Sequence, residues 1–176
     1  MLHYFAYGSN LHPIRLLQRI SSANLIGVTS IDSHRLVFHK KSHDGSAKCN
    51  ILETGCPTDI VHGAIYEIAS EHKCDLDRFE GKGSGYIDNE IKLRYHDQDY
   101  LCFTYQAQLS HICDDLKPYH WYKEMVVLGA IYHGFSDTYV SVIASTPSTE
   151  DPDQNRRLEN EALLDKMRNF HQQSTS

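Results

Sequence analysis

Hydrophobic runs of the length that a membrane span requires are missing from this sequence of 176 residues. A spanning helix takes about 20 mostly apolar residues, whereas the longest run here, "MVVLGAIY", covers only Met125 to Tyr132. The start of the sequence also lacks the basic segment and long apolar segment of a secretory signal. We therefore expect a cytoplasmic protein without a membrane partner.

An excess of basic residues is also missing. The chain has 17 Lys and Arg against 23 Asp and Glu, and its net charge is −6 with neutral histidines. Nucleic acids and anionic membranes attract proteins with a basic face, so this balance disfavours both as main partners. The five cysteines are odd in number, scattered and without a CxxC motif, so reduced thiols are the expected state.

Motifs for metals and nucleotides are absent as well. Among twelve histidines, His39 and His43 are four residues apart, a spacing that places two ligands on one face only in a helix. The segment around them, "RLVFHKKSHDGSAKCNIL", is instead typical of strand, turn and strand, with Asp44-Gly45 in the turn. No GxGxxG fingerprint occurs. We expect no metal and no cofactor.

What is present suits one globular domain: 40% of the residues are apolar and 23% are charged. One strand and a short helix come first, then several strands, then helices. This order favours an α+β fold with a closed or strongly curved sheet. The predicted strands are residues 2–7, 35–39, 47–53, 61–68, 86–95 and 100–107. The predicted helices are 13–20, 71–79, 119–133, a short one capped by Asp137, and 153–170.

The C-terminal part differs in composition from the rest of the chain. We expect a domain at residues 1–145 and a charged helical extension at 146–176 that packs on the same domain. A stripe of Leu158, Ala162 and Leu163 would face that domain. Binding of an outside partner by this helix is the alternative.

The stretch "YFAYGSNL" ends a predicted core strand in Gly8-Ser9-Asn10. Glycine at a strand end permits backbone angles that other residues avoid. Successive N–H groups in such a turn can form an anion-binding concavity, which would suit a carboxylate or an oxyanion. The alternative is that Ser9 or Asn10 only caps the following helix.

The stretch "LDRFEGKGSGY" places Glu80 at the end of a predicted helix, before a glycine suited to a left-handed C-terminal position. A carboxyl group held in a partly dry site can both take and return a proton. The alternative is an ordinary solvated glutamate.

The stretch "KPYHWYKEMVVLGA" crowds aromatic residues at a predicted helix start. Tyr122, Val126 and Gly129 fall on one stripe, and Gly129 would allow the helix to pack closely on the sheet. Aromatic residues here indicate either the core or ligand contacts.

Together these stretches resemble the gamma-glutamylcyclotransferase-like family. "YFAYGSNL" looks like its N-terminal signature, and "LDRFEGKGSGY" looks like its "LD..EG....Y" segment. The "DGSAKCNI" turn, the "VHGAIYEI" strand and the "PYHWYKEMVVLGA" helix start occupy matching positions. The resemblance runs from Leu2 to Tyr139.

The resemblance implies a small mixed β-barrel flanked by helices, with a cavity beside the loop after the first strand. It also implies that Glu80 is the catalytic acid/base. Tyr86 and Tyr122 fall near pocket tyrosines of the family, although the spacing after the glutamate differs among members. The implied substrate-binding residues are Tyr7, Gly8, Ser9, Asn10, Leu11, Tyr86 and Tyr122.

The implied reaction releases 5-oxoproline from a γ-glutamyl amino acid or amine, when the substrate's α-amine attacks its own γ-carbonyl. One carboxyl, Glu80, could move both protons. A glutathione-directed enzyme, an enzyme on another γ-glutamylated metabolite and a non-catalytic carboxylate-binding module stay open as alternatives. A serine or cysteine hydrolase is disfavoured, because Ser9 lacks the GxSxG context and no cysteine stands in a context that suggests activation. The oligomeric state is open, with a homodimer as one option.

Overall fold

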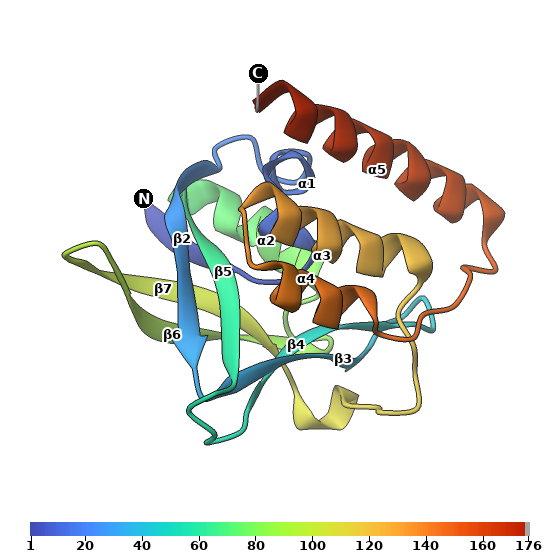
Figure 1. The fold of residues 1–176 in the computed structure, drawn as a ribbon, viewed down its shortest axis with the longest axis horizontal. Helices are drawn as coiled ribbons and strands as arrows, with labels where there is room; N and C mark the ends of the chain where they lie inside the picture. Colours follow the sequence, from blue (N-terminus) through green and yellow to red (C-terminus); the bar gives the residue numbers. More distant parts are fainter. Residues whose placement is uncertain (175–176) are drawn as a thin grey trace.

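The strands of the protein form two sheets. A computed structural model describes the backbone of residues 1–174 and the side chains of residues 1–170; residues 175–176 of the predicted extension lie outside the described part. A five-stranded sheet has the order β2-β5-β1-β7-β6, and β3 pairs with β4 in a second sheet (Figure 1). The strands are β1 (Leu2–Ala6), β2 (Asn24–Asp32), β3 (His34–Lys41), β4 (Ala47–Glu53), β5 (Ile60–Ile68), β6 (Tyr86–Tyr95) and β7 (Gln98–Ala107).

Helices gather beside the larger sheet, where α3 packs against both α4 and α5 (Figure 1). The α-helices are α1 (Pro13–Leu17), α2 (Lys73–Glu80), α3 (His120–Tyr132), α4 (Asp137–Ala144) and α5 (Gln154–Ser174). Short 3-10 turns are η1 (Ser9–Leu11), η2 (Ser70–His72) and η3 (Leu109–His111).

Strand β1 is the central strand of the larger sheet, because two strands lie on each side of it. It runs antiparallel to β5 and parallel to β7, and the side chains from Tyr4 to Ala6 are buried. The hydrophobic run at the start of the sequence therefore becomes a core strand, as predicted. The loop that follows this strand is consequently anchored in the middle of the molecule.

The mixed α+β class is confirmed, but the predicted barrel is not. Strands β2 and β6 remain the two edges of the larger sheet, and β3–β4 forms a separate pair. The edges approach each other through side chains: Thr29 Oγ1 donates to the Arg94 carbonyl oxygen at 2.8 Å. The Tyr95 ring also occupies the space where Gly27 would carry a Cβ. A ring between two edges leaves no room there for a main-chain ladder.

Strand β2 was not among the predicted elements. Its residues alternate poorly between buried and exposed, because it lies at a sheet edge and pairs only with β5. The periodicity that identifies a half-buried strand is therefore weak in this segment.

Two helix starts differ from the prediction in their capping residues. His12 Nδ1 accepts the N–H of Ile14 and so caps α1, which means that neither Ser9 nor Asn10 serves as its cap. Ser136 rather than Asp137 caps α4, by accepting the N–H of Tyr139. The ends of α2 and α3 agree with the prediction, since Gly81 and Gly134 have left-handed φ values of 66° and 68°.

Of the stripe predicted for α5, only Leu163 faces the core. Leu158 is 53% exposed and Ala162 is exposed too, whereas Leu163, Leu164 and Met167 are buried in the core. The buried positions 163, 164 and 167 lie on one face of the helix, because residues three and four apart are neighbours on a helix surface. The apolar residues of α5 are scattered, so the sequence alone is compatible with more than one buried face. The face that is buried is the one that packs against α3.

Asp151 joins the segment before α5 to the start of α3. The Trp121 indole N–H donates to its Oδ2 at 2.9 Å, and Arg156 donates to both carboxylate oxygens. These hydrogen bonds, foremost those from Arg156, lower the pKa of Asp151 to about 2 from its ordinary value near 3.8.

We expect this carboxylate to make stability depend on pH in the acid range. A lowered folded-state pKa gives stability that is present above about pH 4 and is lost as pH falls through about 2. Asp151→Asn should therefore be less stable than wild type near neutral pH, and this gap should close on acidification. Urea unfolding of both proteins along a pH series measures the gap, and a gap that does not change with pH would contradict the assignment.

Gly63 in β5 lies where β1 approaches closely. A Cβ on this residue would stand 2.4 Å from Phe5 Cζ and 2.6 Å from the Ala6 carbonyl oxygen. We expect Gly63→Ala to lower the free energy of unfolding by about 1–3 kcal/mol, because overpacking moves the central strand. Urea unfolding tests this, and an unchanged transition midpoint would show that β1 yields without cost.

Candidate active site

The loop after β1 is buried between β4 and α3. Gly8 lies so close to β4 that a Cβ there would be 3.1 Å from the Cys49 Cβ. Ser9, Asn10 and Leu11 form η1 and are almost fully buried. No side chain caps the start of η1, and the hydrogen bonds of the described residues leave the N–H groups of Gly8, Ser9 and Asn10 without an acceptor.

Helix α3 supports this loop from behind. A Cβ on Gly129 would be 2.9 Å from Leu11 Cβ and 3.1 Å from the backbone nitrogen of His12. The expected close packing at Gly129 is therefore against the loop rather than the sheet. The Tyr66 hydroxyl donates to the Leu11 carbonyl at 2.9 Å, and His133 Nε2 lies 2.8 Å from the same oxygen. Burial lowers the pKa of His133.

Glu80 faces the loop from the end of α2. Gly81 ends that helix in a left-handed conformation, and the Lys82 N–H then bonds the Asp77 carbonyl at 2.9 Å, which turns the chain sharply. The Asn10 amide donates to Glu80 Oε1 at 2.8 Å. The Glu80 side chain is only 16% exposed. The structure thus brings together two residues that are seventy positions apart in the sequence.

Arg19, which the sequence analysis did not single out, completes this contact. Its Nη1 forms an ion pair with Glu80 Oε1 and donates to Asn10 Oδ1 at 2.9 Å. The guanidinium also lies over the Phe79 ring. Position 19 falls just after α1 and belongs to no motif, so the sequence carries no signal for this role beyond its closeness to the loop.

The predicted tyrosines attach the site to the main chain of neighbouring strands. The Tyr7 hydroxyl donates to the Tyr105 carbonyl, and the Tyr86 hydroxyl donates to the Cys49 carbonyl. The Tyr122 hydroxyl accepts the N–H of Cys49 at 3.1 Å. Burial raises the pKa of all three phenols well above the ordinary value. These side chains are therefore neutral and rigidly held.

An inner cavity of about 20 Å³ lies among these residues, enough for about one water molecule. All predicted site residues except Leu11 line it, since the Leu11 side chain packs into the core against α3. The lining residues that the sequence analysis missed are Tyr4, Cys49 and Tyr105. The Tyr4 hydroxyl accepts a hydrogen bond from Asn10 at 3.1 Å.

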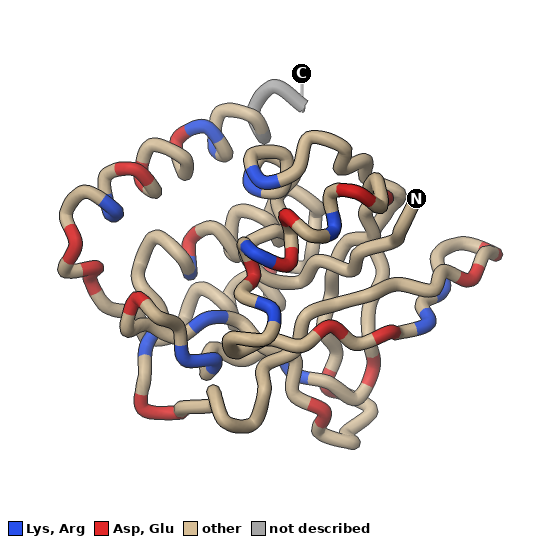
Figure 2. Tube along the Cα trace, turned by 180° about the vertical axis from the view of Figure 1, so that it is seen from behind, with Lys and Arg blue, Asp and Glu red and all other residues tan. Residues whose placement is uncertain are grey.

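An outer cavity of about 200 Å³ shares four walls with the inner one, namely Ser9, Glu80, Tyr86 and Tyr122. Its remaining walls are rich in cations, which are Arg15, Arg19, Lys40 and Lys48. Along the chain as a whole, Lys and Arg are interspersed with Asp and Glu (Figure 2). The site is therefore a small polar chamber behind a basic vestibule, by which we mean the outer cavity.

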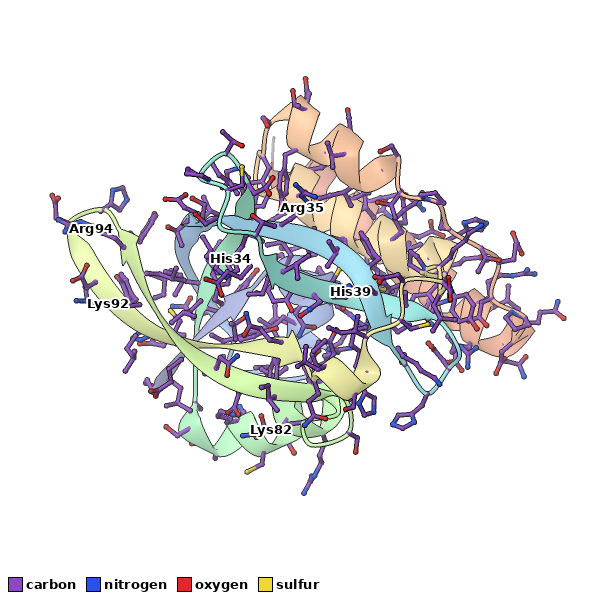
Figure 3. The ribbon with its side chains drawn as sticks, turned by 90° about the horizontal axis from the view of Figure 1, so that it is seen from below. His34, Arg35, His39, Lys82, Lys92 and Arg94 are labelled. Carbon is purple, nitrogen blue, oxygen red and sulfur yellow. The ribbon has the colours of Figure 1, made fainter. Side chains whose placement is uncertain are left out.

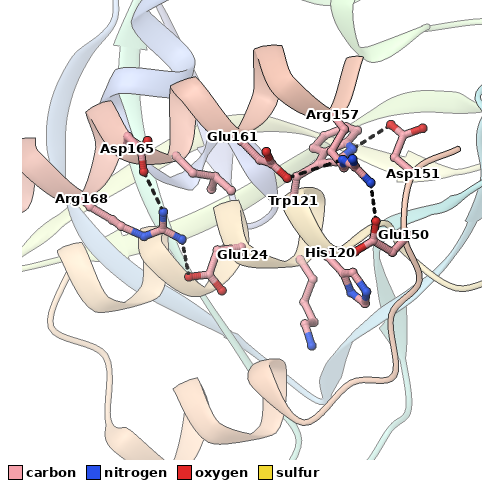
Figure 4. Close-up of a pocket in the computed structure, with 11 residues that line it drawn as sticks. His120, Trp121, Glu124, Glu150, Asp151, Arg157, Glu161, Asp165 and Arg168 are labelled. Atoms are coloured by element: carbon pink, nitrogen blue, oxygen red, sulfur yellow. Dashed lines mark hydrogen bonds and ion pairs between the residues drawn. The ribbon is translucent and has the colours of Figure 1, made fainter. Parts of the chain in front are cut away.

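A larger cavity of about 550 Å³ lies elsewhere, between α3, α5 and the segment that joins α4 to α5 (Figure 4). Its charged walls already pair with one another: Arg157 bonds Glu150, and Arg168 bonds both Glu124 and Asp165. Neither Glu80 nor the loop after β1 contributes to it. Its size alone does not make it the reactive site.

Histidine and acidic side chains do not gather as metal ligands. Within residues 1–170, no three His, Cys, Asp or Glu side chains are placed to hold a metal ion. His39 lies on the same strand as His34 and Arg35 (Figure 3). Its ring is engaged by Asn50 at 2.9 Å and by Asp114 at 3.3 Å.

In the described part of the chain, no helix is both long and apolar enough to cross a membrane.

Known proteins resemble this chain over most of its length. The AIG2-like family model matches residues 60–143, which include Glu80, Tyr86 and Tyr122. A gamma-glutamylcyclotransferase of Mus musculus is 30% identical over 145 residues, which cover 77% of this chain and 73% of the mouse protein. The chain belongs to the gamma-glutamylcyclotransferase family. Its family is one of enzymes of the cyclotransferase type, so the predicted family and enzyme class are both confirmed.

Further members of the gamma-glutamylcyclotransferase family support this assignment. The protein of Bos taurus is 29% identical over 145 residues, with 77% of this chain and 73% of the bovine protein covered. A solved structure of a gamma-glutamyl cyclotransferase superimposes with a TM-score of 0.78 over 94% of this chain and 98% of that one. At 23% identity, this superposition shows that the fold is shared.

Cys49 is the one lining residue whose chemistry could mislead, because a thiol in a pocket suggests a nucleophile. Burial raises its pKa to about 12, so the reactive thiolate is scarce at neutral pH. We expect iodoacetamide at about pH 8 to alkylate the exposed Cys56 and Cys74 while Cys49 stays unlabelled. Mass spectrometry of peptides from the native protein measures this. Rapid labelling of Cys49 would contradict this expectation and make Cys49 a candidate nucleophile.

Proposed function

We propose that the protein is a γ-glutamyl cyclotransferase that releases 5-oxoproline from a γ-glutamyl compound. The proposal rests on one observation: Asn10 donates a hydrogen bond of 2.8 Å to Glu80 Oε1, and both residues line the same inner cavity. A carboxylate and a loop with free main-chain donors thereby face one small chamber. The family relationship supports the same activity.

In this reaction the substrate supplies its own nucleophile. The α-amine attacks the γ-carbonyl, a five-membered ring closes, and the amine attached to the γ-carbon leaves. The protein must hold the chain folded so that nitrogen meets carbonyl carbon, which is a proximity effect. The rigid tyrosines around the inner cavity suit that task, because their hydroxyls are fixed to the main chain at Cys49 and Tyr105. The reaction as written uses no metal and no nucleotide.

Glu80 is proposed to move both protons. Its Oε1 is engaged by Asn10 and Arg19, whereas Oε2 accepts no hydrogen bond from the described residues. We assign Oε2 as the atom that takes a proton from the attacking amine and returns one to the leaving nitrogen. Arg19 and Asn10 act as positioning residues, because they fix the carboxylate plane.

The loop after β1 is proposed to stabilise the oxyanion that forms on the γ-carbonyl. The N–H groups of Gly8, Ser9 and Asn10 lack acceptors in the described structure, and the first of them belongs to a residue held against β4. Donors that are fixed before the reaction stabilise developing charge without reorganisation. Leu11 contributes by anchoring the loop in the core rather than by touching the substrate.

The experiment is Glu80→Gln, assayed for 5-oxoproline release from a panel of γ-glutamyl amino acids, γ-glutamyl amines and glutathione. We expect a loss of about 10²–10⁴-fold in kcat/KM, because the amide cannot exchange protons. Glu71→Gln is the matched control, since Glu71 is exposed and lies just before the same helix. Circular dichroism and thermal melting of each variant establish that the fold is kept.

Activity retained in Glu80→Gln would assign the proton transfer to another group. Wild-type protein that binds γ-glutamyl compounds without turning any of them over would identify a carboxylate-binding module instead. The panel also separates a glutathione-directed enzyme from one that acts on simpler γ-glutamyl compounds.

A further inference from the structure

The carbonyl of Leu11 ends the turn η1 in the core, and the chain that follows cannot pair it. Pro13 has no N–H to offer. The Ile14 N–H bonds His12 Nδ1 at 3.2 Å, and the Arg15 N–H bonds the His12 carbonyl at 3.0 Å. Because a buried carbonyl without a partner is costly, this oxygen needs donors from elsewhere in the fold.

Two side chains supply those donors. The Tyr66 hydroxyl lies 2.9 Å and His133 Nε2 lies 2.8 Å from the Leu11 carbonyl oxygen, and the two donor atoms are 3.5 Å apart. A carbonyl oxygen only accepts, so we assign the ring proton of His133 to Nε2. The two donors use both lone pairs of the oxygen. We call Tyr66 and His133 the loop clamp.

Both members of the loop clamp are held firmly by their own surroundings. Tyr66 belongs to β5 and is only 1% exposed, and burial raises the pKa of its hydroxyl, so the donor keeps its proton. His133 follows the last residue of α3. Gly134 turns the chain there, and the Phe135 N–H bonds the Ala130 carbonyl at 3.0 Å. The Phe135 ring consequently stacks on the His133 ring, with centroids 5.8 Å apart.

The hold on Leu11 is passed on to the start of the loop. The Leu11 N–H donates to the Gly8 carbonyl at 3.0 Å. That carbonyl shares a planar trans peptide unit with the Ser9 N–H, in which the two bonds point in opposite directions. A Gly8 carbonyl that is turned toward Leu11 therefore turns the Ser9 N–H away from it. Gly8 and Ser9 line the inner cavity, whereas Leu11 does not.

The loop clamp acts on the site from outside it. Neither Tyr66 nor His133 is among the residues that line the inner cavity or the vestibule. A substrate in these cavities would touch neither side chain. Any effect of the clamp on the reaction has to pass through the Leu11 peptide unit.

We propose that Tyr66 and His133 are positioning residues, which hold the Leu11 carbonyl so that the Ser9 N–H points at the oxyanion formed in the inner cavity. This inference rests on the proposed function. Either donor alone still pairs the carbonyl, so the orientation of the loop is lost only when both are removed. A donor that acts on charge developed in the transition state affects kcat rather than KM.

The test measures kcat and KM in Tyr66→Phe, His133→Leu and the double variant, with the γ-glutamyl compound that wild type converts fastest. We expect each single variant to stay within about threefold of wild type and the double variant to lose about 10- to 100-fold in kcat, because coupled partners are not additive. KM should stay within about twofold. His133→Gln in the Tyr66→Phe background should restore most of kcat, because the glutamine amide supplies an N–H near the position of Nε2.

Tyr139→Phe combined with His133→Leu is the matched control. The Tyr139 hydroxyl accepts the N–H of His62 at 3.2 Å, so this change removes a hydroxyl bonded to the same strand as Tyr66 but distant from Leu11. We expect the kcat of His133→Leu alone. Thermal melting of every variant sets an assay temperature at which all of them are folded. A control as slow as the double variant would show that general weakening, and not the loop clamp, lowers kcat.

A double variant with wild-type kcat, or a loss that the glutamine does not restore, would overturn the loop clamp while leaving the proposed function intact. No 5-oxoproline release by wild type would overturn the proposed function. The clamp is then judged by amide hydrogen exchange, which should be at least about tenfold faster at the Leu11 N–H in the double variant than in wild type. Unchanged exchange would overturn it.

Should the double variant fail to fold, hydrogen exchange in the single variants decides the question. The Leu11 amide should then exchange faster in both Tyr66→Phe and His133→Leu than in wild type, and Tyr139→Phe should leave its rate unchanged. Wild-type exchange in both single variants would overturn the loop clamp.

Discussion

The contact between Asn10 and Glu80 is the constraint on which the site depends. It joins the loop of the central strand to the end of α2, and Arg19 closes the triangle from the other side. Asn10 lies in η1 after β1, Arg19 lies just after α1 and Glu80 ends α2, so the contact forms only when all of these segments are in place. A charged network of this kind is sensitive to the loss of any member, because the remaining partners stay buried.

The sequence predicted those parts of the fold that depend on local chemistry. Gly81 ends α2 and Gly45 turns the β3–β4 hairpin because both need left-handed angles, and Pro13 begins α1. Features set by distant neighbours were not predictable. Strand β2 lacks clear alternation at its edge position, and the buried stripe of α5 is selected by α3.

The same division holds for the site. Ser9, Asn10 and Glu80 stand in motifs with recognisable spacing, and the structure places all three around one cavity. Arg19 stands in no motif. Its contacts with Asn10 and Glu80 arise from its place just after α1, which is a property of the assembled chain. The AIG2-like match begins at residue 60 and therefore includes the glutamate but not the loop.

Gly129 has a consequence for how this protein can vary. A glycine inside a helix usually invites replacement by alanine, which favours helix by about 1 kcal/mol. Here Leu11 of the loop occupies the space that the methyl group of an alanine at position 129 would need. The loop can therefore pack on α3 only while this position is glycine. A Gly129→Ala change that raises the helix propensity of α3 would therefore displace the loop and, with it, the N–H donors of Gly8, Ser9 and Asn10. On the proposed mechanism, thermal stability and turnover are thus coupled at this position, so a change that raises one must be accompanied by a redesign that preserves the other.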